Sequence, residues 1–125
     1  MAILSGLKGK KVLITGASGG IGRSISCLFA ECGATLGIHY NKNKEDAESL
    51  AREINNGDGE AVCFQADLLS PGAANLVDDF ITRFGGIDVL INNAGAVIGF
   101  NDFLELDENS WRGTQKLNVE VPFFL

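Results

Sequence analysis

Short apolar runs alternate with longer stretches of helical periodicity along this chain. Four of the runs are almost continuously apolar instead of alternating in polarity, a pattern typical of strands covered on both faces in a parallel sheet. The predicted strands are residues 11–15, 35–40, 61–66 and 87–92. We therefore expect a sheet with two buried faces.

The gaps between these strands hold segments with apolar residues at helical spacing and glycine-rich ends. The predicted helices are residues 20–32, 44–55 and 71–84. The first should stop at Gly33, since glycine most readily takes the left-handed conformation beyond a helix. Ser70 suits the N-cap of the third helix and Pro71 its first position. The apolar face expected for the first helix consists of Ile21, Ile25, Leu28 and Phe29.

This alternation of strand and helix predicts the fold class. Successive parallel strands are joined by right-handed crossovers, which place helices on both faces of one sheet. The expected fold is an α/β, doubly wound parallel sheet that forms one domain over residues 1–125. A last helix is expected from about Asp107, with Leu117, Val121 and Phe124 on one side. Because no stop signal follows, we expect the chain to end within that helix.

Composition narrows the class of function. The chain of 125 residues is 46% hydrophobic and 21% charged, which is the make-up of one soluble globular domain. The 10 basic residues are outnumbered by 16 acidic ones and do not cluster, which argues against nucleic acid as a partner. Neither a membrane span nor a signal peptide is recognisable, so we expect a cytoplasmic protein. Reduced, mostly buried thiols without a metal role are expected at Cys27, Cys32 and Cys63.

Glycines gather where the first strand should meet the first helix, in the stretch TGASGGIG that starts at Thr15. Gly16 would permit a tight turn, Gly20 the close approach of a pyrophosphate, and Gly22 close packing of helix on strand. The free amides and positive dipole at the start of that helix would then face an anion. This context favours a dinucleotide site over a plain turn.

The glycine spacing resembles the T-G-x-x-x-G-x-G motif of the short-chain dehydrogenase/reductase family. The chain contains three further stretches that resemble motifs of that family and occur in the same order, namely ADL at 66–68, INNAG at 91–95 and LNVEVPFF at 117–124. The resemblance extends over essentially the whole chain, but only over the first half of the family's usual length. It implies a Rossmann-like sheet of strand order 3-2-1-4 and an NAD(P)-dependent oxidoreductase, most similar to 3-oxoacyl-thioester and sugar or polyol reductases.

The resemblance also implies which residues contact the cofactor. Those of the glycine loop are Gly16, Ser18, Gly19, Gly20, Ile21 and Gly22. Asp67 and Leu68 would flank the adenine. Asn93, Ala94 and Gly95 would pass close to a ribose at the carboxyl end of the fourth strand, where open α/β sheets bind ligands. A structural role for Asn93, in capping the strand, is compatible with this assignment.

The end of the second strand bears on the choice of cofactor. NAD enzymes usually carry a carboxylate there, whereas this sequence reads HYNKNK. Asn41 and Lys42, with Lys44 as a further candidate, can meet a 2′-phosphate, so NADP is favoured over NAD. Many NADP-dependent relatives have a basic residue in place of Gly19, and Arg23 is a candidate substitute. The alternative is that both lysines are solvated loop charges.

Hydride transfer in this family depends on a Tyr, a Lys four residues later and a Ser, which the resemblance places beyond Leu125. Tyr40 and Lys44 have that spacing, but they follow the second strand at the adenine end, out of reach of a nicotinamide ring. One catalytic position does match, Asn118, whose main-chain carbonyl holds a water in the family. Pro122 cannot donate a hydrogen bond to that carbonyl, so we expect a kink there.

Other predictions concern the remaining residues and the partners. His39 and Trp111 are expected to be structural. A nucleotide-binding module without chemistry is an alternative function, and a flavodoxin-like domain is a third that does not account for TGASGGIG and NNAG. The family implies a small carbonyl or alcohol substrate, no metal, and a homodimer or homotetramer. An isolated chain would expose an apolar strand edge and the VPFFL face, so we expect self-association or poor stability.

Overall fold

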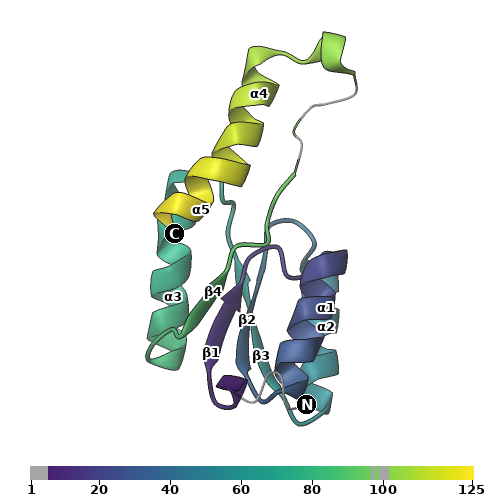
Figure 1. The fold of residues 1–125 in the computed structure, drawn as a ribbon. Helices are drawn as coiled ribbons and strands as arrows, with labels where there is room; N and C mark the ends of the chain where they lie inside the picture. The colour runs from purple at the N-terminus through teal and green to yellow at the C-terminus, as the bar shows by residue number, and fades with distance from the viewer. Residues whose placement is uncertain (1–5, 97, 99–101) are drawn as a thin grey trace.

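A parallel sheet forms the centre of the computed structural model, which describes residues 6–96, 98 and 102–125 (Figure 1). The strands are β1 (Lys11–Ile14), β2 (Thr35–Tyr40), β3 (Glu60–Gln65) and β4 (Val89–Ile91). Their order is β3-β2-β1-β4 and each neighbouring pair is parallel, which confirms the prediction. The chain winds outward from β1 and then returns to its other side, so a topological switch point lies between β1 and β4.

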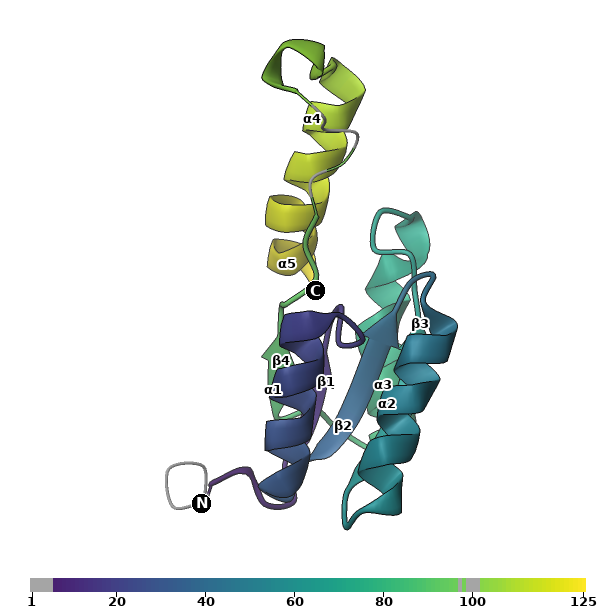
Figure 2. The same ribbon diagram turned by 90° about the vertical axis from the view of Figure 1, so that its right-hand side faces the viewer.

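Helices cover both faces of this sheet, as the two ribbon views show (Figures 1 and 2). α1 (Gly20–Glu31) and α2 (Lys44–Asn56) lie on one face, and α3 (Asn75–Phe84) lies on the other. α4 (Glu108–Gln115), a π-helical turn (Lys116–Glu120) and α5 (Val121–Phe124) follow one another and extend beyond the end of the sheet. The fold is therefore a Rossmann-like, doubly wound α/β sheet. No helix in the described part of the chain is both long and apolar enough to cross a membrane.

Each face of the sheet has its own apolar core, because successive side chains of a strand point to opposite faces. Val12 and Ile14 pack with residues of α1 and α2, whereas Leu13 packs with residues of α3. The Phe80 ring of α3 lies directly on the backbone of β2, since a Cβ added at Gly37 would be 2.6 Å from it. The near-continuous apolar runs of the sequence are thus explained by cover on both faces.

Several element ends differ from the prediction. α3 is preceded by a 3₁₀ turn (Pro71–Ala74), and Ser70 does not cap it: its hydroxyl donates to the Asp67 carbonyl at 2.7 Å. Asp107 does cap α4, since its carboxylate accepts the Ser110 amide at 2.7 Å, and this hydrogen bond lowers the pKa of Asp107. Gly33 follows α1 with φ 87°, which confirms the predicted left-handed end. β4 is three residues shorter than its predicted range.

Some side chains on the predicted apolar helix faces are exposed. Ile21, in the first turn of α1, is 73% exposed. Phe124 is 77% exposed, since Val121 is the residue of α5 that reaches the core. Trp111 is 54% exposed in the single chain, so it does not pack into the core of this chain, and its predicted structural role stays untested. The sequence predicted mostly buried thiols, whereas the free thiols of Cys27, Cys32 and Cys63 are half-buried.

We predict that Phe80→Ala lowers the free energy of unfolding by about 3–5 kcal/mol, since it removes a fully buried ring and leaves a cavity against β2. The exposed Thr82 on the same helix provides the control, and Thr82→Ala should change stability by less than about 0.5 kcal/mol. Urea unfolding followed by circular dichroism measures both. Equal effects of the two substitutions would contradict this packing.

Candidate functional site

Glycine is required at one position in the loop after β1 and at one in the first turn of α1. Gly16 has φ 60°, and a Cβ there would lie 2.9 Å from the Cα of Ala94. At Gly22 a Cβ would lie 2.5 Å from the Gly16 carbonyl oxygen. A Cβ at Gly20, by contrast, would have no described atom within 4 Å. The predicted tight turn and close helix packing are thus present, and Gly20 faces open space.

Side chains from the residue directly after β1 and from the segment after β4 lock this loop in place. The Thr15 hydroxyl accepts hydrogen bonds from the amides of Asn93 at 3.1 Å and Ala94 at 3.0 Å. The Asn93 side-chain amide in turn donates to the carbonyls of Thr15 at 3.1 Å and Gly16 at 3.0 Å. Asn93 therefore has a structural role in holding the glycine loop, and this role is compatible with a contact to a ligand.

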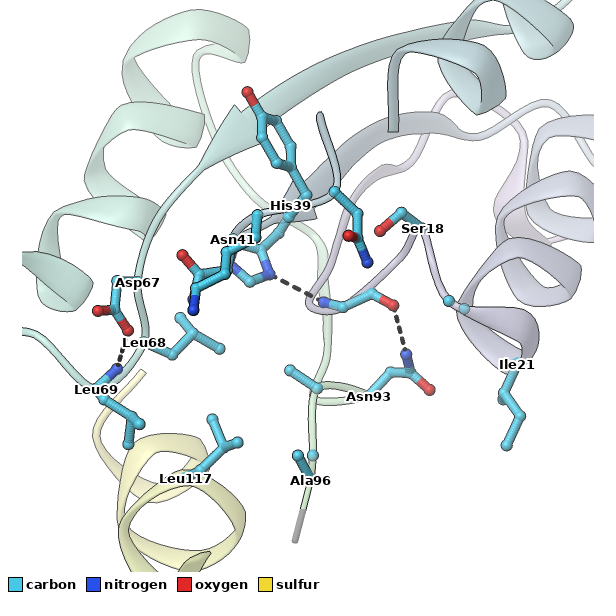
Figure 3. A pocket seen from close by; sticks show the side chains of 18 of the residues that line it. Ser18, Ile21, His39, Asn41, Asp67, Leu68, Leu69, Asn93, Ala96 and Leu117 are labelled. Atoms are coloured by element: carbon cyan, nitrogen blue, oxygen red, sulfur yellow. Dashed lines mark hydrogen bonds between the residues drawn. The ribbon is translucent and has the colours of Figure 1, made fainter. Parts of the chain in front are cut away.

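His39 holds the same loop from the other side (Figure 3). The Gly16 amide donates to its Nδ1 at 2.9 Å, and its Nε2 lies 2.9 Å from the Ala66 carbonyl oxygen. The Ala17 amide donates to the main-chain carbonyl of His39 at 3.1 Å. Burial lowers the pKa of His39, which favours the neutral ring. The prediction of a packed histidine is confirmed, but sequence reasoning missed its contact with the glycine loop.

A pocket of about 800 Å³ opens at the carboxyl ends of the strands (Figure 3). It contains every residue that the sequence assigned to a cofactor: Gly16, Ser18, Gly19, Gly20, Ile21, Gly22, Asn41, Lys42, Asp67, Leu68, Asn93, Ala94 and Gly95. The residues that sequence reasoning did not assign to it are His39, Tyr40, Asn43, Leu69, Ala96, Ile98 and Leu117. Segments that follow all four strands thus meet around one cavity.

The start of α1 gives the pocket a positive end. Gly19 is the N-cap and provides no side-chain cap, and the amides of Gly20 and Ile21 belong to the first turn, which has no intrahelical acceptor. Those amides and the helix dipole attract an anion. Among the residues that line the pocket, Lys42 is the one cation and Asp67 the one acid.

Two other basic residues considered for this pocket are engaged elsewhere. Arg23 pairs with Glu53 of α2 at 2.6 Å, and Lys44 lies 3.7 Å from Glu48. Neither lines the pocket. The suggestions that Arg23 substitutes for a basic residue at the glycine loop, and that Lys44 reaches the same site, are therefore not supported by the geometry. Lys42 is left as the basic residue at the end of β2.

Asn118 fixes the segment after β4 against the last helix. Its side-chain amide donates to the Ala96 carbonyl at 2.7 Å and to the Thr114 carbonyl at 2.8 Å. A Cβ at Gly95 would lie 2.6 Å from the Asn118 side-chain oxygen, so this approach requires glycine in the NNAG stretch. Asn118 itself stands beside the pocket, whereas its neighbour Leu117 lines it.

The helix around Asn118 is distorted, although not as a simple kink. A π-helical turn (Lys116–Glu120) precedes Pro122, and the Val121 amide donates to the Lys116 carbonyl five residues earlier. Pro122 has no amide to donate to Asn118, which is the cause of the break that the sequence predicted. The chain accommodates the missing bond by widening the turn.

The strand order, the glycine loop and the pocket at the switch point define a doubly wound, Rossmann-like α/β protein. The family model for short chain dehydrogenases matches residues 10–125, and the chain belongs to this family.

Known relatives share this fold and part of the sequence. The short chain dehydrogenase mdpC of Emericella nidulans is 32% identical over 120 residues, which are 95% of this chain and 45% of that protein. The structure of the NADH-dependent reductase A1-R′ complexed with NAD is 34% identical with TM-score 0.86, over 97% of this chain and 51% of that one. A short chain dehydrogenase of Burkholderia cenocepacia in complex with NADP is 35% identical with TM-score 0.87, over 94% and 48%. The chain thus spans about half the length of these relatives.

We predict that Thr15→Val lowers the free energy of unfolding by about 1–3 kcal/mol, because the amides of Asn93 and Ala94 lose their acceptor. Thr15→Ser keeps the hydroxyl and should retain most of the wild-type stability. Chemical denaturation of the two variants compares them directly. A Ser variant as unstable as the Val variant would show that packing of the methyl group, and not the hydrogen bonds, holds the loop.

Proposed function

We propose that this chain binds a nicotinamide dinucleotide in the pocket at the carboxyl ends of the strands, as the cofactor-binding part of an oxidoreductase. In that reaction hydride passes between the nicotinamide and the carbonyl or alcohol carbon of a small substrate. The observation that carries the proposal is that the glycine loop, the open start of α1 and the ends of β2, β3 and β4 all line one cavity. Relatives solved with NAD and with NADP support a cofactor of this class.

Each part of the pocket suits one part of the dinucleotide. The amides of Gly20 and Ile21 would hold the pyrophosphate, since anions bind at uncapped helix N-termini. Asp67 and Leu68 would flank the adenine, with the carboxylate kept in place by the Leu69 amide at 3.0 Å. The segment that contains Asn93 would lie along the nicotinamide ribose, as in other ligand sites at such switch points.

NADP is the preferred cofactor in this proposal. Lys42 lines the pocket after β2, where a carboxylate would otherwise hold the ribose hydroxyls of NAD. Asn41 lies beside it and offers a second polar group to a 2′-phosphate. The structures solved with NAD and with NADP favour neither cofactor, so the preference rests on the charge of Lys42.

We further propose that these 125 residues bind the cofactor without turning it over. Tyr40 is the one tyrosine of the sequence and lies at the end of β2, while Lys44 is turned toward Glu48. The pair therefore does not form a proton donor beside a nicotinamide. Asn118, beside the pocket, would assist a proton path through its main-chain carbonyl. Oxidation of NADPH by the chain with simple aldehydes or ketones would contradict this proposal and would exclude a module that only binds.

Association with further copies is also proposed. Large apolar side chains are exposed on the last helical elements, at Trp111, Val119, Phe123 and Phe124. A large group of exposed apolar side chains marks a surface that contacts another molecule. They support a homo-oligomer formed through these elements, either a dimer or a tetramer.

Ile21 gives a test of the pyrophosphate site. It lies exposed in the first turn of α1 and lines the pocket. We expect Ile21→Asp to weaken NADPH binding at least about 10-fold relative to Ile21→Asn, because a carboxylate repels the pyrophosphate. The same carboxylate should keep or raise stability, since it is favourable at a helix N-terminus. Calorimetric titration measures the affinities and thermal unfolding measures the stabilities. Equal affinities of the two variants for NADPH would contradict a pyrophosphate site at the start of α1.

Lys42 and Lys44 give a matched pair for the cofactor preference. We expect Lys42→Ala to weaken NADP binding by about 10-fold and to leave NAD binding unchanged, because one charge-assisted contact to the 2′-phosphate is lost. Lys44→Ala should alter neither, since this side chain points to Glu48. Dissociation constants for both cofactors decide the matter. A parallel loss of both would assign Lys42 a role unrelated to the 2′-phosphate.

A further inference from the structure

His39 joins the ends of two strands to the glycine loop. It lies near the carboxyl end of β2 and is 2% exposed. The Gly16 amide, in the loop after β1, donates to one ring nitrogen, and the other nitrogen faces the carbonyl of Ala66, after β3. The ring therefore links segments that are 23 and 27 residues away along the chain.

The two contacts determine the protonation state of the ring. A backbone amide can only donate, so Nδ1 must be the unprotonated nitrogen that accepts from Gly16. A carbonyl can only accept, so Nε2 must carry the proton that it donates to Ala66. Neutral, Nε2-protonated imidazole satisfies both partners, and no other form does.

Gly16 is thereby held at both ends of its polar backbone. His39 accepts from its amide, while Asn93 and the Gly19 amide donate to its carbonyl. Because Gly16 has φ 60° and starts the loop that leads into α1, its orientation sets the direction of the amides that follow. Loss of the acceptor on His39 would leave the Gly16 amide without its partner and release one side of the loop.

We propose that His39 is a positioning residue of the nucleotide site, which holds the Gly16 amide and so fixes the glycine loop in the conformation that receives the pyrophosphate. This inference rests on the proposed function of the pocket. It assigns a role in affinity to a residue whose side chain forms no part of the glycine motif.

Acid should weaken the site. A proton on Nδ1 would place two donors face to face and break the contact with Gly16. Burial lowers the pKa of His39 below 6.5, and the hydrogen bond to Ala66 opposes this shift. As the pH decreases, the unfolded chain therefore binds this proton before the folded chain does. The contribution of neutral His39 to the free energy of unfolding is fully present above pH 6.5 and is lost as the pH decreases toward the pKa of the folded state.

Other titrating groups do not contact the ring. His39 points to the α3 face, since its neighbour Ile38 belongs to the core on the face of α1 and α2. The charged side chains on the elements around that face are Lys42, Asp67, Asp78, Asp79, Arg83, Lys116 and Glu120, whereas Tyr40 packs with the core on the opposite face. In the described part of the chain, the imidazole hydrogen-bonds only to Gly16 and Ala66.

Three substitutions separate the two contacts. The side-chain oxygen of His39→Asn stands where Nδ1 stands, so it can still accept from Gly16. The amide of His39→Gln stands nearer to Nε2 and can reach Ala66, and His39→Leu keeps neither contact. We expect NADPH to bind about 10-fold more weakly to the Leu and Gln variants, with the Asn variant close to wild type. Hydrogen exchange of the Gly16 amide should become faster in the same two variants only.

His39 is the one histidine of the sequence, so its ring is resolved without assignment in long-range ¹H–¹⁵N spectra. We expect a neutral Nε2-protonated ring with a pKa below 6.5. Affinity for NAD, which has no 2′-phosphate to titrate, should decrease with acid along the same titration curve. This wild-type measurement decides the matter even where a variant does not fold.

The outcomes separate the two proposals. If the wild-type protein binds NADPH and NAD but the Leu and Asn variants bind alike, or if affinity ignores the titration of His39, the positioning role is overturned and the proposed function stands. If the wild-type protein binds neither dinucleotide at any pH, the proposed function fails and the positioning role fails with it, whatever the Gly16 exchange rates show.

Discussion

The pocket depends on how the peptide unit of Gly16 is held. Its amide is bound by His39 of β2 and its carbonyl by Asn93, which follows β4, so the loop after β1 is fastened to both neighbouring strands. The backbone approaches Ala94 so closely that a Cβ would lie 2.9 Å from its Cα. A side chain at this position would therefore separate β1 from β4 where the chain reverses its winding.

The same loop leaves the start of α1 without a side-chain cap. Glycine at an N-cap costs a helix only about a few tenths of a kcal/mol relative to serine, aspartate or asparagine, and α1 has Gly19 there with no side-chain cap. Its first amides thus have no intrahelical acceptor, and Gly20 and Ile21 line the same pocket as Lys42. The stability lost at this helix end is offset by the two buried cores that α1, α2 and α3 form on the sheet.

Local patterns predicted most of the fold and most of the pocket. The near-continuous apolar runs identified the strands, and the family resemblance placed them in the right order. The residues that the sequence assigned to a cofactor line one pocket because they follow strands, and strand ends meet at one edge of a parallel sheet. The contacts that the sequence did not reveal depend on long-range geometry. The hydrogen bonds of His39 form only when β2 lies beside β1 and β3, and the ion pair between Arg23 and Glu53 forms only when α1 and α2 lie side by side. Helical periodicity also does not predict the exposure of Ile21, which lies in the first turn of α1 and is 73% exposed.

The most direct test of the central claim is an NMR titration of the ¹⁵N-labelled protein with NADP. Saturable shifts are predicted for the amides of residues 18–22, 41–43, 67–69 and 93–96, which come from four separate segments around one pocket. Shifts confined to a different surface, or none at concentrations up to several millimolar, would contradict a dinucleotide site at the carboxyl ends of the strands.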